Sequence, residues 1–314
     1  MRKKEFCTEF VPINGIEQYF LHYPADSRTV VLFLHGGPGQ TEMFFTHLTR
    51  PQTPACSFVF YDQRGTGKTQ ARNLSRPEDI SLDVLISDLH ETVAYVGQQY
   101  PGQHIILLGH SWGSILGIEY VKRYPEAVSA YVGMGQVVHM LSGERIAFEK
   151  LKTAVIAKGH ARSMKLIKSF EGYPDNVDKD HYIKTMLRFR KFQAKYGYSV
   201  SVGGLMTKVI KSPLFSLKDI HPFLTTFKTN KNLMDTLIKY NTIDMINYSL
   251  PVFFICGQDD WQTPVVLVEN YFETLHAPYK EMFYVEKAGH LTDIDNPCGY
   301  NQAIAAICTA IERS

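Results

Sequence analysis

Short hydrophobic runs recur along this chain, separated by longer segments in which apolar residues follow helical spacing. The short runs are rich in β-branched and aromatic residues, which is typical of buried strands. They lie at 29–35, 57–61, 104–110, 128–134, 252–256 and 280–285. Two earlier segments, 5–13 and 17–23, alternate with a period of two and predict further strands. Strands and helices that alternate in this way predict an α/β fold, in which helices flank both faces of a mostly parallel sheet.

Two helices of this core have clear boundaries in the sequence. Ser81 is expected to cap the first one, because its hydroxyl can accept a hydrogen bond from a backbone N–H of the first turn. Apolar residues then follow at helical spacing from 84 to 96, and Pro101 ends the helix. The second helix is expected around 115–121 and ends before a Tyr-Pro pair.

The strand pattern is interrupted between residues 136 and 245, where the sequence predicts only helices. Breaks between these helices are expected at 172–174, 203–204 and 212–213. Because the strands after residue 250 are needed to complete the sheet, we expect one α/β domain built from 1–135 and 246–314. Residues 136–245 would then be a helical cap inserted into that domain.

A serine motif lies between a predicted strand and a predicted helix. Gly-His-Ser-Trp-Gly at 109–113 fits the pattern G-x-S-x-G, and its strand–turn–helix setting is that of a nucleophile elbow. A serine hydroxyl becomes an effective nucleophile when a base takes its proton and a third group holds that base. Ser111 is therefore the candidate nucleophile.

Candidates for the base and the acid follow the last two predicted strands. Asp259 and Asp260 come directly after the strand at 252–256, and His290 follows the strand at 280–285. The order serine, aspartate, histidine is the order of the α/β-hydrolase triad. At this point both aspartates are candidates for the acid. One is expected to face His290, and the other to lie in solvent or to cap the next helix.

A second glycine cluster supplies candidates for an oxyanion hole. His-Gly-Gly-Pro-Gly at 35–39 ends a predicted strand. Hydrolysis through a tetrahedral intermediate needs backbone N–H groups that point at the developing negative charge. Gly37 can donate such a bond, whereas the proline that follows it has no N–H. The second expected donor is Trp112, the residue after the candidate nucleophile.

Three motifs together resemble the proline iminopeptidase family: the cluster at 35–39, Asp-Gln-Arg-Gly-Thr-Gly at 62–67, and the serine motif at 109–113. The resemblance implies a serine aminopeptidase of the α/β-hydrolase fold with a helical cap, and it covers roughly 1–135 and 250–314.

The resemblance also assigns further positions. The family's acid, in a Gly-x-x-Asp-x-x-x-Pro stretch, falls on Asp260, and the histidine of its Gly-His pair falls on His290. Asp62 and Arg64 match positions that look structural in the family.

One part of the family pattern is missing. Family aminopeptidases bind the free amine of the substrate with acids of the cap, one of them in a Trp-x-x-Trp-Glu stretch. The two tryptophans of this chain, Trp112 and Trp261, lie outside 136–245. The glutamates between 136 and 245 are Glu144, Glu149 and Glu171. The resemblance therefore extends to the fold and the triad of the family, but not to its specificity for proline. A carboxylic ester cleaved by the same triad is the alternative substrate, and a non-catalytic binding protein is the remote alternative.

The composition of the chain bears on the class of protein and on where it acts. The chain has 314 residues, of which 45% are hydrophobic and 20% charged, as in ordinary globular proteins. It has no apolar stretch of the roughly 20 residues that span a bilayer and no signal-peptide pattern. Its 5 cysteines show no Cys-x-x-Cys spacing. We expect a cytoplasmic enzyme that acts on a small molecule or short peptide, without cofactor, metal, nucleic-acid partner or membrane partner.

Two short patterns resemble other kinds of site, a phosphate-binding loop and a metal site. Residues 65–69 imitate a phosphate-binding loop, but its first glycine would fall on Asp62. His290, Asp293 and Asp295 are residue types that coordinate cations, yet the two aspartates are better placed as turn or capping residues before the final helix.

The charge is distributed unevenly. The chain carries a formal net charge of +2, but residues 136–245 hold 19 Lys and Arg against 9 Asp and Glu, a net +10. The remainder holds 14 against 22, a net −8. The basic helices either present solvated faces, or attract substrates with a carboxylate, or dock electrostatically on the acidic body.

Overall fold

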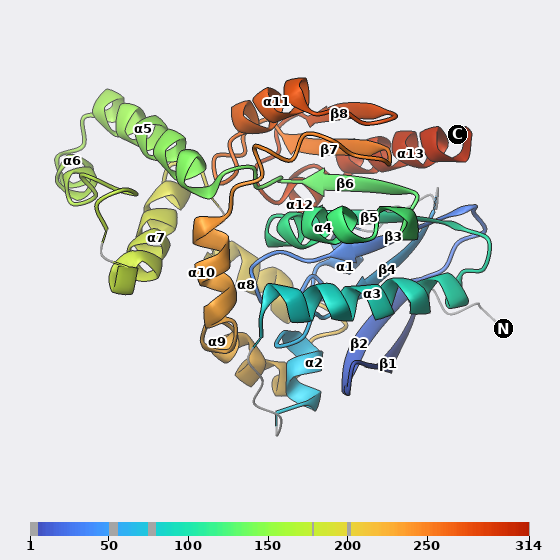
Figure 1. Cartoon of the computed structure of the whole chain (residues 1–314). Coiled ribbons are helices and arrows are strands. Elements are labelled where there is room, and N and C mark those ends of the chain that lie inside the picture. The colour runs from blue at the N-terminus through green and yellow to red at the C-terminus, as the bar shows by residue number, and fades with distance from the viewer. Residues whose placement is uncertain (1–5, 50–55, 75–79, 178, 200–201, 314) are drawn as a thin grey trace.

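The computed structural model describes residues 6–49, 56–74, 80–177, 179–199 and 202–313. Within them one eight-stranded sheet has the order β1-β2-β4-β3-β5-β6-β7-β8 (Figure 1). The strands are β1 Cys7–Ile13, β2 Ile16–Tyr23, β3 Thr29–Leu34, β4 Ser57–Tyr61, β5 His104–His110, β6 Ala130–Met134, β7 Val252–Gly257 and β8 Lys280–Val285. Strands β3 to β8 are parallel, whereas β1 and β2 are antiparallel to their neighbours. The predicted mostly parallel sheet is confirmed.

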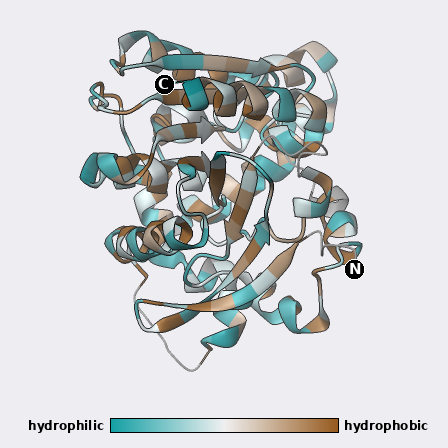
Figure 2. Ribbon diagram, turned by 90° about the vertical axis from the view of Figure 1, so that its right-hand side faces the viewer, coloured by the Kyte–Doolittle hydropathy of each residue, from teal (hydrophilic) through white to brown (hydrophobic). Residues whose placement is uncertain are grey.

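Both faces of the sheet are covered. Alternate residues of β3 enter two different hydrophobic clusters: Leu32 packs with the helices on one face, and Phe33 with those on the other. The first face is covered by α3 (Leu82–Gln99), α4 (Trp112–Arg123) and α11 (Val265–Thr274), and the second by α13 (Pro297–Arg313). Figure 2 shows hydrophobic residues along the central strands. The expected flanking helices are therefore present on both faces.

The start of α3 shows how the sequence sets an element boundary. The Ser81 side chain accepts a hydrogen bond from the backbone N–H of Val84, as predicted from its position before the apolar stripe. The helix ends at Gln99, shortly before Pro101, whose ring and missing N–H are incompatible with a continuing helix.

Only helices lie between β6 and β7 in the described part of the chain, and we refer to residues 140–239 as the helical insertion. Its α-helices are α5 Met140–Lys158, α6 Ala161–Lys168, α7 Lys179–Ala194, α8 Val202–Ile210, α9 Ile220–Thr229 and α10 Lys231–Lys239. In Figure 1, α5 to α7 form a lobe that projects from the sheet. The break expected at 203–204 is wrong, because both glycines belong to the first turn of α8. In the first turn of any helix the backbone N–H groups have no hydrogen-bond partner within the helix, whatever the sequence.

Polar contacts fasten the second half of the helical insertion to two loops of the core. Asp219 is buried and forms an ion pair with Lys68, with both Nζ–Oδ distances below 3 Å (2.9 and 2.8 Å). The Thr226 hydroxyl of α9 donates to the carbonyl of Gly39 at 2.5 Å. A Cβ on Gly39 would lie 2.2 Å from that hydroxyl oxygen, so the close approach requires glycine there.

Within the described residues, the helices are too short or too polar for any of them to cross a membrane.

Candidate active site

Ser111 occupies a sharp turn between β5 and α4. Its backbone angles are φ 52° and ψ −116°, a strained conformation for a residue with a side chain. A Cβ on Gly109 would lie 2.3 Å from the carbonyl oxygen of Gly113, and a Cβ on Gly113 would lie 2.0 Å from that of Leu34. The two motif glycines are therefore required by the close packing of strand and helix, and this packing presents the Ser111 side chain at the carboxyl edge of the sheet.

The loops after β7 and β8 bring a carboxylate and an imidazole together. His290 Nδ1 lies 2.9 Å from Asp260 Oδ2, and both side chains are largely buried. Asp260 Oδ1 accepts hydrogen bonds from the backbone N–H groups of Gln262 and Thr263, and Oδ2 accepts one from the Thr263 hydroxyl. Asp259 is exposed. Of the two aspartates that the sequence offered, Asp260 is the one that contacts His290.

The surroundings of Asp260 favour its ionised form. Burial alone would raise the pKa of this carboxyl, but the charge of His290 and the hydrogen bonds from His290 and Thr263 outweigh burial and hold the pKa below its ordinary value. A carboxylate can only accept, so His290 Nδ1 carries the proton of the shared bond. Nε2 is then the nitrogen available to Ser111. Among the described residues no hydrogen bond joins Ser111 Oγ to His290, and such bonds often tighten only when substrate binds.

His110 connects the serine turn to the histidine loop. Its Nε2 lies 2.8 Å from the backbone carbonyl of His290, and the two rings have centroids 5.0 Å apart. Burial and the neighbouring charge of His290 lower the pKa of His110 to about 3, so the ring is neutral and Nε2 donates to the carbonyl. No sequence signal marks this contact, because the pattern G-x-S-x-G allows any residue before the motif serine.

The glycine cluster lies beside Ser111. A Cβ on Gly36 would be 3.4 Å from Ser111 Cβ, and Gly37 has φ 120°, which favours glycine. Among the described residues, neither the backbone N–H of Gly37 nor that of Trp112 donates a hydrogen bond. Trp112 is the first residue of α4, where N–H groups lack helical partners. Both N–H groups are therefore available to a ligand.

Gln63 ties this cluster to the start of α4. Its amide donates to the carbonyl of His35 at 3.1 Å, and its side-chain oxygen accepts from the Trp112 indole at 3.3 Å. His35 Nε2 accepts from the Gln63 backbone, and burial lowers the pKa of His35 to about 4, which keeps this nitrogen unprotonated. Gln63, which links His35 to the side chain of Trp112, thus belongs to the 62–67 motif.

Asp62 and Arg64, whose positions look structural in the family that the motifs resemble, make contacts within the core. The Asp62 carboxylate accepts from the Thr41 hydroxyl and from the backbone N–H of Lys68. Arg64 binds Asp88 through two nitrogens, at 2.7 and 2.9 Å. The ion pair is buried, and it holds the 62–67 loop against α3.

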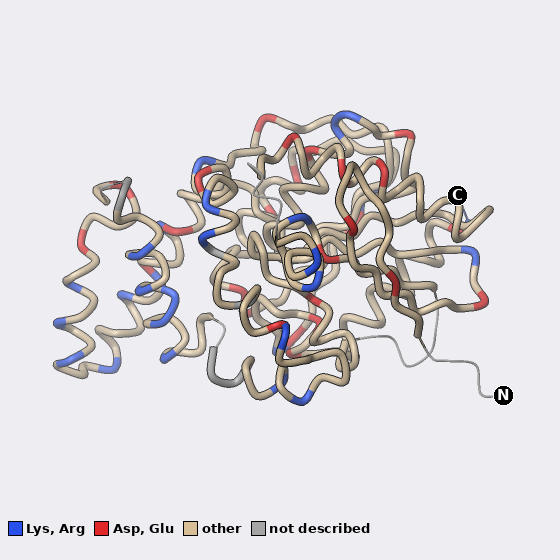
Figure 3. The backbone as a smooth tube through the Cα atoms, turned by 90° about the horizontal axis from the view of Figure 1, so that it is seen from below, with Lys and Arg blue, Asp and Glu red and all other residues tan. Residues whose placement is uncertain are grey.

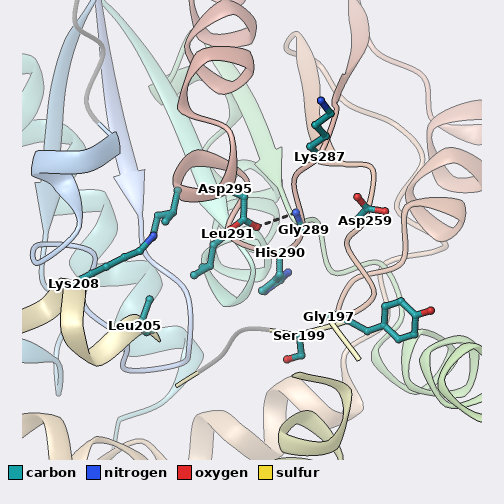
Figure 4. Close-up of a pocket in the computed structure, with 12 residues that line it drawn as sticks. Gly197, Ser199, Leu205, Lys208, Asp259, Lys287, Gly289, His290, Leu291 and Asp295 are labelled. Atoms are coloured by element: carbon teal, nitrogen blue, oxygen red, sulfur yellow. Dashed lines mark hydrogen bonds between the residues drawn. The ribbon is translucent and has the colours of Figure 1, made fainter. Parts of the chain in front are cut away.

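A cavity of about 380 Å³ lies beside His290 (Figure 4). Its walls include Tyr198, Ser199 and Lys208 of the helical insertion and Asp259, Lys287 and His290 of the core. Ser111 is not part of its wall. The cavity therefore adjoins the candidate triad on the side of His290, between the insertion and the core.

The glutamates of the helical insertion do not line this cavity. Glu144 is fully buried, and it binds the Arg190 guanidinium and the Tyr173 hydroxyl. Burial raises the pKa of Glu144, and Arg190 partly opposes this. Glu149 and Glu171 are exposed. None of the three glutamates of the described insertion therefore reaches the cavity beside His290.

Asp293 and Asp295, whose residue type could coordinate a cation, lie at the turn before the final helix. Asp295 accepts a hydrogen bond from the backbone N–H of Gly289 at 2.9 Å. Asp293 lies in the short helix α12 (Thr292–Asp295). Within the described residues, no three His, Cys, Asp or Glu side chains gather as a metal site would need.

Comparisons with known proteins identify the family and the fold of the chain. A family model described as alpha/beta hydrolase fold matches residues 29–297. The probable aminopeptidase YbaC of Bacillus subtilis is 26% identical over 296 residues, covering 92% of this chain and 89% of that protein. A proline iminopeptidase of Lactiplantibacillus plantarum is 25% identical over 312 residues, covering 92% and 96%. The crystal structure of proline iminopeptidase from Mycobacterium smegmatis shares the fold, with a TM-score of 0.69 at 16% identity over 98% of this chain and 99% of that one.

Proposed function

The chain belongs to the alpha/beta hydrolase family, and on that premise we propose that it is a serine hydrolase with Ser111, His290 and Asp260 as its triad. The observation that carries the proposal is the buried hydrogen bond between Asp260 and His290, formed at the same edge of the sheet as the Ser111 turn. In such a triad the serine is the nucleophile, the histidine is the base, and the aspartate orients the histidine.

The reaction follows from these positions. Ser111 Oγ attacks the acyl carbon while His290 Nε2 takes its proton, and Asp260 stabilises the resulting imidazolium. The N–H groups of Gly37 and Trp112 bind the oxyanion, and each such donor is typically worth about 10²–10³ in kcat. His290 then protonates the leaving group. Water, deprotonated by His290, cleaves the acyl-enzyme in the second half of the reaction.

The first candidate substrate is a short peptide or amino-acid amide that loses its N-terminal residue. Two relatives that match about nine-tenths of the chain carry aminopeptidase or proline iminopeptidase names, which supports this class.

A second candidate is a small ester or other acyl compound without a free amine. It is favoured by the glutamates of the described insertion, none of which lines the cavity beside His290. Arg190 and Tyr173 already bind Glu144, and Glu149 and Glu171 are exposed.

A fluorophosphonate probe tests the hydrolase proposal. The wild type should be labelled, and Ser111→Ala should lose the label completely because the probe reacts with an activated serine hydroxyl. Ser169→Ala, which changes an exposed serine of the helical insertion, is the matched control and should keep the label. An unlabelled wild type, or equal labelling of Ser111→Ala, contradicts the proposal.

A substrate panel separates the two candidates. Amino-acyl anilides, the same anilides with an acetylated amine, and short-chain aryl esters are compared by kcat/KM. An aminopeptidase should lose activity when the amine is acetylated. An acyl hydrolase should cleave the esters best and should tolerate acetylation.

A further inference from the structure

A lysine and two aromatic rings meet where the helical insertion contacts the loop of Asp260. Lys150 lies on α5, Tyr198 follows α7, and Trp261 comes directly after Asp260. The Lys150 Nζ atom lies 4.2 Å from the centroid of the Trp261 ring and 5.9 Å from that of the Tyr198 ring. The two ring centroids are 6.1 Å apart, with an angle of 61° between the ring planes. We call these three residues the aromatic cluster.

The geometry of the aromatic cluster is attractive. An ammonium group within about 6 Å of a ring centroid is drawn to the face of the ring, most strongly for tryptophan. Aromatic rings at this distance and tilt pack favourably edge to face. All three side chains are half-buried. Lys150 forms no ion pair within the described part of the chain, and its neighbour Glu149 pairs with another lysine. The two rings are therefore the partners of Lys150.

A buried amide joins the same elements. Gln193 of α7 is fully buried, and its Nε2 donates to the Trp261 carbonyl at 3.4 Å. Its backbone carbonyl accepts from the N–H of Tyr198 at 3.1 Å. On the core side, Asp260 Oδ1 accepts from the N–H of Gln262, so the hydrogen bond of the candidate acid spans Trp261. The loop that holds Asp260 therefore also fixes the position of Tyr198.

Tyr198 is the member of the aromatic cluster that lines the cavity beside His290, and the other two members are not part of the wall. Its chain neighbours Gly197 and Ser199 lie below His290 in Figure 4. The charged side chains of the wall have both signs. Further apolar side chains of the wall are Leu205, Leu291 and Ile294.

The chemistry of the proposed reaction indicates which part of a substrate this cavity takes. His290 gives its proton to the leaving group, so the leaving group must lie beside His290 while Ser111 bonds to the acyl carbon. His290 is part of the cavity wall, whereas Ser111 is not. The cavity is therefore on the leaving-group side of the scissile bond.

We propose that the cavity beside His290 binds the leaving group of the substrate, and that Tyr198 determines which leaving groups fit. Lys150 and Trp261 are positioning residues, which act on the leaving group only through Tyr198. The ring and the apolar side chains of the wall suit an uncharged leaving group with an aromatic or aliphatic body. The inference rests on the proposed function, since a leaving group exists only if the chain is a hydrolase.

Two series of esters test the assignment. The first keeps the acyl group that the substrate panel favours and enlarges the alcohol from methyl through benzyl to naphthylmethyl. The second keeps the benzyl alcohol and lengthens the acyl group from acetyl to hexanoyl. kcat/KM is measured per fluorophosphonate-titrated active site. A p-nitrophenyl ester with the acyl group of the first series gives the rate of deacylation, from the steady phase after its burst.

Tyr198→Ala should lower kcat/KM for the naphthylmethyl ester about 10-fold relative to the methyl ester, because the large alcohol loses its wall. Lys150→Met and Trp261→Phe weaken the cation–ring contact and should shift the same ratio about threefold in the same direction. The acyl series should keep its ratios. Deacylation should keep its rate, because the acyl-enzyme no longer holds the leaving group. Lys152→Met and Tyr284→Ala change exposed residues outside the cavity wall and should leave every ratio unchanged.

Each part of the inference has an outcome that contradicts it. An unchanged leaving-group ratio in Tyr198→Ala, or an equal change in the acyl series, contradicts the assignment of the cavity. A ratio that moves in Tyr198→Ala but in neither Lys150→Met nor Trp261→Phe contradicts the positioning role. Slower deacylation would mean that the cluster acts on the triad and not on the leaving group. A wild type that the fluorophosphonate probe does not label contradicts the proposed function instead.

Discussion

Asp260 shows at the scale of one residue how the site distinguishes between two neighbouring acids. Its carboxylate accepts from two backbone N–H groups, one hydroxyl and His290, whereas the Asp259 side chain is exposed. The two backbone N–H groups and the hydroxyl fix the orientation in which the carboxylate meets His290. Asp260 is therefore suited to hold His290 in one tautomer, with the proton on Nδ1.

Asp260→Asn should lower kcat by about 10⁴-fold, because an amide can favour the wrong tautomer of His290. Asp259→Asn is the matched control and should change kcat by less than threefold, about 0.6 kcal/mol in barrier. Both are measured on the best substrate of the panel. Comparable losses in the two variants would contradict the assignment of the acid.

The same carboxylate makes stability depend on pH. The pKa of Asp260 is below its ordinary value in the folded protein, because the effects of His290 and Thr263 outweigh burial. Its contribution to the free energy of unfolding is therefore present above the unfolded value of 3.8 and is lost as pH falls through the folded pKa. The difference in Tm between wild type and Asp260→Asn should shrink as pH is lowered from 7 toward about 3. A difference that stays constant over this range would contradict the argument.

Residue-scale prediction from the sequence had a physical limit. Ser111 and His290 could be proposed because a local motif and the ends of strands mark them. The link from His110 to the His290 carbonyl joins residues 180 positions apart. No local pattern encodes such contacts, because they depend on how the loops meet in the folded chain.

At the scale of elements, α9 is a direct neighbour of residues 35–45, the loop that carries Gly37 and that we call the oxyanion loop. The Thr226 hydroxyl donates to the Gly39 carbonyl, and the Asn230 amide donates to the Gly65 carbonyl at 3.0 Å. The helical insertion therefore supports the loop that carries Gly37 as well as covering the site. The strands and core helices could be predicted from the spacing of hydrophobic residues. The contacts between α9 and the core could not, because polar pairs across an interface leave no periodic signal in the sequence.

Thr226→Val keeps the shape of the side chain and removes its hydroxyl. The buried Gly39 carbonyl then loses its donor, which should lower the free energy of unfolding by about 1–3 kcal/mol and lower kcat with it. Thr236→Val is the matched control and should have little effect, because the half-buried Thr236 donates only to the Asn232 carbonyl of its own helix, α10. Urea unfolding and kcat are measured for both. Loss of stability without loss of kcat would show that α9 does not support the oxyanion loop.

At the scale of the whole molecule, charge separates the helical insertion from the body. Lys and Arg are frequent on the lobe of α5 to α7 in Figure 3, and residues 136–245 carry a net +10 against −8 for the remainder. The cavity wall itself has both signs, with Lys208 and Lys287 near Asp259 and Asp295. Any preference for charged substrates should therefore come more from the long-range field of the insertion than from one lysine.

This field predicts a salt effect that depends on the substrate. For a substrate with a free carboxylate, kcat/KM should fall as ionic strength rises from about 10 to 200 mM, because the Debye length shortens from about 30 Å to below 10 Å. A neutral substrate of equal size is the matched control and should show a level profile. Replacing the exposed residues Lys165, Lys184 and Lys191 with glutamine removes three positive charges from the lobe and should flatten the slope for the acidic substrate. Equal slopes for both substrates would mean that the basic helices are solvated faces without a part in substrate binding.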